Sequence, residues 1–337
     1  MLNLSKIFNR LFIAVLLSGL FDACKNDDSS PENKFPARKV SSIFIDGQGV
    51  VWAGTDIGIL SYWNNEWTSF ESLNTGEVVD IADQKANSGS QLWLATANSA
   101  QLADYKVNEI TSAKLHTTST SGLIDNQISA VLTDAVETSW FATPTGISLL
   151  NKDKWYSEDG FGDLELHPVI SMAAKSDGWI FAGTTGLGVG RFKYDSEIDG
   201  ISGASYYNTE WTTLPSDTIL CIYVDKNNGQ WFGTPKGVAF HAVWETKKEW
   251  KVYSVSNGLI NNRVQAITAD AAGKLWFGTA SGISSFDGQI WKNYTVADGL
   301  GNPCVNDIAI DGEGAIWFAT NNGISVLDNF IWKTFTK

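Results

Sequence analysis

The chain is poor in the residues on which many enzymes and nucleic-acid-binding proteins depend. Its 337 residues include only 3 His, 3 Cys and 7 Pro, and 24 Lys and Arg stand against 37 Asp and Glu. The formal net charge is therefore −13, and no basic block interrupts it, so a sequence-independent grip on a phosphate backbone is disfavoured. We expect no nucleic-acid partner.

Sequence patterns of common catalytic and cofactor chemistry are also missing. The sequence has no nucleophile motif, no Cys/His spacing for a metal and no glycine-rich phosphate loop. Asp-x-x-Gly turns begin at Asp46, Asp270 and Asp311, but none continues into the alternating ligands and closing Glu of a calcium loop. Because Asp and Gly favour tight turns in any case, we expect no metal and no cofactor.

Apolar and aromatic residues, by contrast, are abundant. Hydrophobic residues make up 43% of the chain, which has 15 Trp and 31 Gly. Such a composition is typical of a globular protein with a sizeable core rather than of a disordered chain. The length suits one large domain or two average ones, so the pattern along the chain has to decide the number of domains.

The first 23 residues have the pattern of an export signal. Lys6 and Arg10 precede an uncharged, mostly apolar run from Leu11 to Phe21, which is too short to span a bilayer. The residues around Cys24 resemble a bacterial lipoprotein signal, in which the Cys becomes the lipidated first residue. The acidic residues that follow are similar to the surface-export signal of Bacteroidetes lipoproteins.

We therefore expect a lipoprotein-type signal peptide over residues 1–23, a lipid on Cys24 and a polar linker over 24–38. The expected location is the periplasmic or outer-membrane surface of a Gram-negative, Bacteroidetes-like cell envelope, with membrane contact through the lipid anchor only. Phe21 and Asp22 depart from the usual lipoprotein pattern. Cleavage as an ordinary secreted protein therefore stays open as the alternative.

A four-residue anchor of the type Trp-Phe-Gly-Thr recurs seven times. It is regular at Trp276 to Thr279 and degenerate at Phe181 to Thr184, and its copies lie roughly 40 to 50 residues apart, the length of a four-stranded propeller blade. The anchors end at Thr55, Thr96, Thr143, Thr184, Thr234, Thr279 and Thr320. Seven anchors predict seven blades.

Within each copy, turn residues separate four short segments that have the pattern of strands. In the sixth copy, Val264 to Ala269 alternates as a strand, Asp270 to Gly273 forms a turn, and three further strands continue to Tyr294. We predict an all-β fold, a seven-bladed β-propeller with four-stranded antiparallel blades over residues 39–337. Because blades one and seven each contain four strands of their own, we expect side-chain packing to close the ring.

Twelve of the fifteen Trp fall at two positions of the repeat, the anchor and the fourth strand. We expect them to pack between blades, because large flat side chains on adjacent sheets cover each other when blades stack around an axis. The fourth-strand set comprises Trp67, Trp155, Trp211, Trp250, Trp291 and Trp332. Trp63, Trp179 and Trp244 lie outside the repeat, and sugar stacking stays open for them. An insertion over Asp195 to Thr209 is expected at the rim of blade four.

Two cysteines remain after the signal segment. Cys221 and Cys304 fall two blades apart, on or near inner strands. We place them beyond the ~7 Å between Cα atoms that a disulfide can span, so we expect two free thiols.

A second motif precedes the first strand of three blades. It reads Gly122-Leu-Ile-Asp-Asn126, Gly258-Leu-Ile-Asn-Asn262 and Gly299-Leu-Gly-Asn302. Together with the anchor and the Gly-Ile-Ser third strand, it resembles the two-component regulator propeller repeat family over residues 39–337. In that family the repeats form the periplasmic sensor of hybrid histidine kinases, often in bacteria that degrade polysaccharides. No kinase, membrane helix or linking β-domain follows the last repeat here, so we expect a stand-alone, lipoprotein-like member that cannot signal by itself.

Two functions of different classes fit this description. The first, which we prefer, is a non-catalytic, envelope-anchored module for ligand binding, sensing or scaffolding, with an unknown glycan, peptide or envelope protein as its partner. The alternative is a propeller enzyme, such as a lyase resembling the streptogramin lyases, with His167 beside Asp163 and Glu165 in the site. His116 and His241 fall in strands and are expected to pack.

Strand direction predicts which face of the propeller binds a ligand. In a four-stranded meander, the loops between blades and those between second and third strands emerge together, around the mouth of the central channel. The candidate ligand-binding residues there are Asn126, His167, Lys236, Asn262, Arg263 and Asn322, with Asp56 and Asn321 in the same loops. Asn126 and Asn262 are equally suited to capping their own loops. The Asp side chains of the opposite face are expected to bind their own backbone.

Overall fold

The recurring anchor forms the second strand of each blade. The computed structural model describes residues 35–337 except for 71–72, 74, 87–88, 159–166 and 243–249. Six of the seven second strands are buried at every residue, among them β2 (Val51–Thr55) and β26 (Ile316–Thr320). A strand covered on both faces needs apolar or small side chains throughout, and the Trp-Phe-Gly-Thr sequence provides them.

The strands form seven antiparallel sheets of four strands each. Blades one to three consist of β1 (Val40–Ile45), β2, β3 (Gly58–Trp63) and β4 (Glu66–Ser69); β5 (Val78–Ala86), β6 (Gly89–Thr96), β7 (Ala100–Lys106) and β8 (Glu109–His116); and β9 (Ala130–Thr133), β10 (Ser139–Thr143), β11 (Gly146–Asn151) and β12 (Lys154–Glu158).

Blades four to seven follow the same order. They consist of β13 (Val169–Ala174), β14 (Ile180–Thr184), β15 (Val189–Asp195) and β16 (Gly200–Tyr207); β17 (Cys221–Val224), β18 (Gln230–Thr234), β19 (Gly237–His241) and β20 (Trp250–Tyr253); β21 (Val264–Ala269), β22 (Leu275–Thr279), β23 (Gly282–Phe286) and β24 (Trp291–Tyr294); and β25 (Val305–Ile310), β26, β27 (Gly323–Asp328) and β28 (Ile331–Phe335). Short 3-10 turns at Val255–Asn257 and Val296–Asp298 lie in the links after blades five and six.

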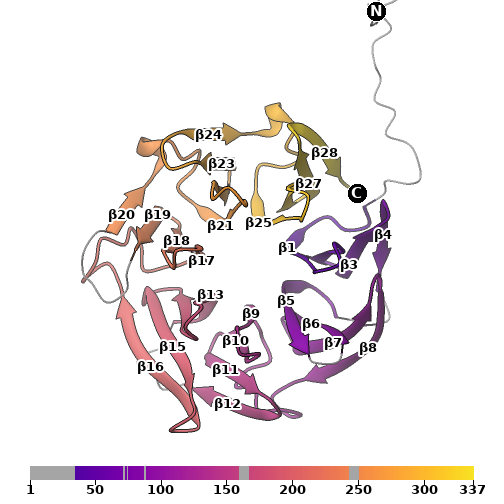
Figure 1. Cartoon of the computed structure of the whole chain (residues 1–337), viewed down its shortest axis with the longest axis vertical. Helices are drawn as coiled ribbons and strands as arrows, with labels where there is room; N and C mark the ends of the chain where they lie inside the picture. The colour runs from indigo at the N-terminus through magenta and orange to yellow at the C-terminus, as the bar shows by residue number, and fades with distance from the viewer. Residues whose placement is uncertain (1–34, 71–72, 74, 87–88, 159–166, 243–249) are drawn as a thin grey trace, which may run out of the picture. The chain divides into compact units, whose positions relative to one another are not determined.

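The sheets surround a central axis, with the first strand of each blade nearest to it and the fourth strand at the perimeter (Figure 1). Hydrophobic clusters lie between adjacent blades; one, for example, joins Trp140 of blade three to Val169 and Phe192 of blade four. The predicted seven-bladed β-propeller with four-stranded antiparallel blades is confirmed. Among the described residues, no helix has the length and apolar character needed to cross a membrane.

Blades one and seven close the ring without sharing a strand, as predicted. Blade seven is made of β25 to β28, and one hydrophobic cluster joins Val40 of β1 to Phe335 of β28. Phe35, placed by the sequence in a polar linker, is fully buried in this cluster, and its ring centre lies 4.9 Å from that of Trp67. The residues just before β1 therefore help to seal the joint.

The Asp of each regular Asp-x-x-Gly turn holds both the turn and the anchor Trp. In blade one, Asp46 accepts the backbone N–H groups of Gln48 and Val50 at 2.9 and 3.0 Å and the indole N–H of Trp52 at 3.1 Å. The same indole bond is made in other blades by Asp134, Asp225, Asp270 and Asp311. These carboxylates are therefore occupied by their own blade, as expected.

Five of the six fourth-strand Trp pack between blades, and the sixth expectation was wrong. Trp211 lies beyond β16 and is 68% exposed. The segment from Asp195 to Thr209, predicted as an insertion at the rim, contains β16 itself, which pairs with β15 from Val189–Tyr207 to Asp195–Gly200. The error arose because β16 has no Trp, and its Tyr207 packs against the blade-four and blade-five cluster instead.

The two remaining cysteines are free thiols, as predicted. Cys221 begins β17 in blade five, and Cys304 immediately precedes β25 in blade seven. Of the Trp outside the repeat, Trp63 ends β3, and Trp179 lies under the guanidinium of Arg191, 3.9 Å from its ring centre. Trp244 lies outside the described residues.

Candidate functional site

A bulge near the start of the first strand brings neighbouring side chains to the central channel. In five blades the pairing of the first and second strands shifts by one residue there, as between Val40 and Ser42. A bulge sets two residues opposite one and so interrupts the normal alternation of side chains. For this reason Ser41 and Ser42 of blade one both line the channel, and so do Asn306 and Asp307 of blade seven.

The channel contains a cavity of about 210 Å³, walled by residues from six of the seven blades. Polar side chains make up much of this wall: Ser41, Ser42, Asp80, Ser129, Ser171, Cys221, Asn306 and Asp307. They alternate with apolar ones, such as Ile170 and Leu220. A small polar ligand, or the end of a longer one, would meet donors and acceptors held on several rigid strands at once.

Two carboxylates give the channel its charge. Burial raises the pKa of Asp80 to about 7, and the neighbouring charge of Asp307 adds to the rise, while N–H donors from the backbone oppose it. Burial also raises the pKa of Asp307 to about 6. The hydroxyl of Ser42 donates to Asp80 Oδ1 at 3.3 Å. Near neutral pH this wall therefore changes both its charge and its ability to donate hydrogen bonds.

The same carboxylates hold neighbouring blades together. Asp80 Oδ2 accepts the backbone N–H of Val131 in blade three at 2.8 Å, and Asp307 Oδ2 accepts that of Ile43 in blade one at 2.9 Å. In blade four, Ser171 at the equivalent position donates instead to the carbonyl of Ile219 at 3.0 Å. In blades one, two, four and seven, the third residue of the first strand thus joins its blade to a neighbouring one.

Sequence reasoning missed this position. The signal was available, because Val-Val-Asp-Ile over residues 78–81 and Val-Asn-Asp-Ile over 305–308 repeat the same Asp in two strands. A charged residue inside an otherwise apolar strand suggests either that the strand register is misassigned or that the side chain meets polar groups. Here the bulge directs the Asp side chain to the polar channel.

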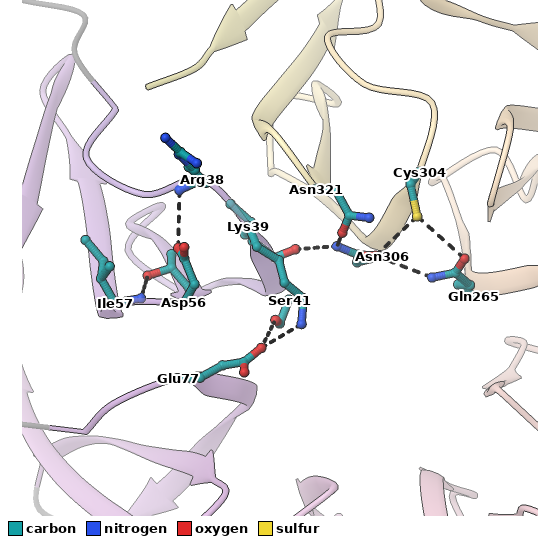
Figure 2. A network of polar contacts seen from close by, with 12 residues as sticks. Arg38, Lys39, Ser41, Asp56, Ile57, Glu77, Gln265, Cys304, Asn306 and Asn321 are labelled. Atoms are coloured by element: carbon teal, nitrogen blue, oxygen red, sulfur yellow. Dashed lines mark hydrogen bonds and ion pairs between the residues drawn. The ribbon is translucent and has the colours of Figure 1, made fainter.

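A polar network lies along one side of the mouth of the channel, across blades six, seven, one and two (Figure 2). Lys39 forms an ion pair with Glu77 at 2.6 Å, and the hydrogen bond from Lys39 lowers the pKa of Glu77. Asn306 Nδ2 donates to the carbonyl of Val40 at 2.8 Å and to Asn321 Oδ1 at 2.9 Å. The rim on this side is therefore held by contacts between blades.

The thiol of Cys304 lies in the same network. Its Sγ is 3.8 Å from Gln265 Oε1 and from Asn306 Oδ1 (Figure 2). Gln265 in turn donates to Asn306 at 3.3 Å. Of the residues in the predicted loops, Asn321 takes part in this network, and Asp56 accepts the backbone N–H of Arg38 at 3.2 Å.

The structure gives the six candidate ligand-binding residues different surroundings. Asn126 Oδ1 accepts the N–H of Thr118 at 2.7 Å, and Asn262 Oδ1 accepts the N–H of Val255 at 2.8 Å, so both cap their own loops. Lys236, Arg263 and Asn322 are exposed. Their role in binding a ligand stays a prediction, since they are not among the described residues that line the channel cavity.

His167 is half-buried over blade four. Its ring lies so close to Gly186 that a β-carbon at that glycine would come within 2.5 Å of Nδ1. Asp163 and Glu165, its proposed partners, lie outside the described residues. No three His, Cys, Asp or Glu side chains of the described ranges gather closely enough to hold a metal ion.

The other two His pack against Trp, as expected. His116 is 4% exposed with its ring centre 5.3 Å from that of Trp155, and burial lowers its pKa to about 4. His241 is fully buried, 4.5 Å from Trp250. Both residues therefore contribute to packing between blades.

Two larger cavities lie between blades on the opposite face, among the Asp-x-x-Gly turns. One of about 430 Å³ separates blades five and six, with Trp231, Phe240 and Tyr253 in its wall and Lys226 and Lys251 at its edge. The other, of about 740 Å³, lies between blades seven and one. The turn carboxylates of both cavities accept hydrogen bonds from their own backbone.

The family model described as "Two component regulator propeller" matches residues 258–281 and 299–322. A comparison with curated proteins found no match for this sequence.

Several solved structures share the fold. The extracellular domain of BT3049 from B. thetaiotaomicron, described as a hybrid two component system, has a TM-score of 0.73 and 22% identity over 89% of this chain and 40% of that chain. PorZ of Porphyromonas gingivalis, a bacterial surface component of the type-IX secretion system, has a TM-score of 0.65 and 17% identity over 90% of this chain and 46% of that chain. A streptogramin B lyase has a TM-score of 0.66 and 17% identity over 85% of this chain and 92% of that chain.

The chain thus spans less than half of the first two structures and nearly all of the lyase. At these identities the likeness concerns the fold. The matched repeats lie in blades six and seven, where the Gly-Leu linkers and the Trp-Phe anchors are most regular. This chain is a seven-bladed propeller in which residues 258–281 and 299–322 match the two-component regulator propeller repeat.

Proposed function

We propose that this chain is a non-catalytic, exported binding module that senses or holds a ligand at the mouth of its central channel. One observation carries the proposal: polar side chains from six blades line a single axial cavity. Convergent polar groups on rigid strands favour recognition of a ligand with several hydrogen-bonding groups. The names of the similar structures, an extracellular domain and a surface component, agree with export and with sensing.

A glycan is the first ligand class to test, because the family resemblance suggests one and the channel wall is rich in hydroxyl, amide and carboxyl groups. The experiment is to screen arrays of oligosaccharides and short peptides with the purified chain. The best ligand is then titrated against variants. We expect Ser129→Leu, which narrows the cavity, to abolish binding without changing the melting temperature greatly. Asn227→Leu on the opposite face is the control.

A pair of exposed lysines tests which face binds. Lys236 lies in a loop of the predicted face, and Lys226 lies at the cavity between blades five and six. Alanine at Lys236 should weaken ligand binding severalfold, whereas alanine at Lys226 should leave it unchanged, and neither should alter stability measurably. The reverse result would move the site to the Asp-x-x-Gly face.

The lyase alternative predicts turnover instead of simple binding. A ligand recovered after long incubation should have an unchanged mass if the chain is a binding module. A new product that disappears in His167→Ala would instead support an enzyme. The fold likeness to a streptogramin B lyase is the reason to include this measurement.

Anchoring through Cys24 belongs to the same proposal and rests on the sequence of the first 24 residues. Cys24→Ser should release the protein from the membrane fraction and abolish palmitate labelling. Membrane association that persists in the variant would refute the anchor, but it would leave the ligand site untouched.

A further inference from the structure

The outer hairpin of blade seven exposes a large apolar side chain on an unfavourable backbone. Its two-residue loop, Asn329-Phe330, joins the paired residues Asp328 and Ile331. Both loop residues have positive φ, 45° and 68°. Phe330 is 86% exposed and Ile331 is 71% exposed. This conformation suits Gly or Asn, and it is costly for a bulky residue such as Phe.

Within the described part of the chain, little packing offsets this cost, because most of the Phe330 side chain is exposed. At the equivalent hairpin of blade one, both loop positions are Asn, Asn64 and Asn65, which tolerate positive φ. In blade two, Val107 has φ 53° but packs against a hydrophobic cluster. Phe330 belongs to no hydrophobic cluster of the described residues, and Lys292 Nζ lies 5.8 Å from its ring centre. A strained residue with so little internal packing indicates a role outside the chain.

The neighbouring hairpin of blade six extends the apolar surface. Ile290, next to β24, is 67% exposed, and Lys292 of β24 reaches towards Phe330. Lys333 of β28 does not belong to this surface, because its Nζ lies 4.6 Å from the ring centre of Phe335 and 3.4 Å from Tyr62 Oη. Apolar tips beside a long cationic side chain such as Lys292 are typical of protein surfaces that rest in the interface of a membrane, where the ammonium reaches the phosphates.

The expected lipid attachment lies within reach of this surface. Phe35 packs in the same cluster as Phe335, at the far end of β28 from Phe330. Strand β28 is roughly 17 Å long at 3.3 Å per residue. The segment from Cys24 to Phe35 spans at most roughly 40 Å when extended. A lipid on Cys24 therefore allows the hairpin tips to touch the bilayer that holds it.

We propose that the hairpin tips of blades six and seven insert into the surface of a lipid bilayer, with Phe330 as the main anchor and Ile331 and Ile290 beside it. The inference uses the proposed function only for the tether at Cys24. Because the net charge of the chain is −13, a strongly anionic surface repels it. The tips therefore select a zwitterionic surface, on which apolar contact dominates.

The test uses the chain without residues 1–24, so that neither the apolar run Leu11 to Phe21 nor a lipid on Cys24 contributes to binding. Binding is measured by co-sedimentation with vesicles of phosphatidylcholine and phosphatidylethanolamine, and again with phosphatidylglycerol added. We expect binding to the zwitterionic vesicles, weaker binding to the anionic ones, and a loss of roughly tenfold or more in Phe330→Gly, as expected for removal of one buried Phe side chain.

The matched control is Asn329→Gly, which changes the adjacent loop residue without removing apolar surface. It should bind vesicles as the parent does. Both variants should melt at or above the temperature of the parent, since Gly relieves the positive-φ cost. Opposite effects of Phe330→Gly on stability and on binding support the proposal. If the parent does not bind vesicles, as expected for tips that dock on a protein instead, the proposal is wrong. Equal loss of vesicle binding in Phe330→Gly and Asn329→Gly would also overturn the proposal.

Discussion

Blades four and six fill the same buried position with different residues. Blade six has Trp276, whose indole N–H lies 3.5 Å from Asp270. Blade four has Phe181 as its anchor and Lys175 six residues earlier, where the regular blades have Asp. Both anchors are buried, Phe181 completely, and both blades keep four strands. A blade therefore needs a large aromatic ring here, whereas the Asp–Trp hydrogen bond is dispensable when both partners are absent.

The largest effect is expected from removing the ring itself. Trp276→Ala should lower the free energy of unfolding by roughly 3–5 kcal/mol, the usual cost of deleting a buried large aromatic. Trp276→Phe should cost far less, because blade four already functions with Phe at this position. Denaturant unfolding of both variants measures the difference. If Trp276→Ala and Trp276→Phe lose the same unfolding free energy, blade six does not tolerate the Phe ring that blade four contains.

A second variant removes one partner of a buried Asp–Trp hydrogen bond and leaves the other partner in place. In blade three, Trp140 is fully buried and its indole N–H donates to Asp134 at 3.0 Å; Asp134 is 3% exposed. Trp140→Phe leaves a carboxylate oxygen without its donor, which costs about 1–3 kcal/mol. The control is Trp276→Phe, where the bond is longer and Asp270 is less buried. Identical unfolding curves for the two variants would show that the hydrogen bond contributes nothing.

Near the central axis, blade six has Ala266 at the strand position where blade two has Asp80. The pKa of Asp80 is raised to about 7 in the folded protein, against a reference value of 3.8. The folded state therefore binds more protons between these values, and the stabilisation present below pH 3.8 is lost as the pH rises through 7.

Asp80→Asn should remove this dependence. Relative to the parent, the unfolding free energy of the variant should rise by on the order of 1–2 kcal/mol between pH 4 and pH 7. Each pKa unit corresponds to 1.36 kcal/mol, and water in the channel reduces the effect. Other titrating groups, such as His116, largely cancel in this difference. A difference that is flat with pH would contradict the raised pKa.

Much of the fold could be predicted because its signals are local. The anchor, the Asp-x-x-Gly turn and the Gly that follows the Thr in most blades lie within a few residues of one another, so their spacing predicts strands and blade count directly. The prediction failed at Trp211, where a familiar residue stands in a loop and the true fourth strand lacks it. A prediction that relies on one residue type fails when a blade fills the same space with another residue, here Tyr207 in place of Trp.

The candidate site was predicted less completely. Of the residues that strand direction places in the loops at the channel mouth, Asn321 and Asp56 take part in hydrogen bonds, and the role of these loops in binding stays a prediction. Strand direction did not separate Asn126 and Asn262, which cap their loops, from side chains that are free to bind. The channel wall itself was missed, since the bulges that direct it depend on how two strands pair.

The sequence by itself determined seven blades, four strands in each and aromatic packing between them, because every blade repeats a short pattern that folds through contacts near in the chain. Only the tertiary structure decided what lies at the axis and at the joint. Asp307 meets Ile43 across 264 residues of sequence, and Phe35 finds its place against Phe335 after the ring closes. Such contacts join segments with no common spacing, so burial, pKa and partner at these positions follow from closure of the ring alone.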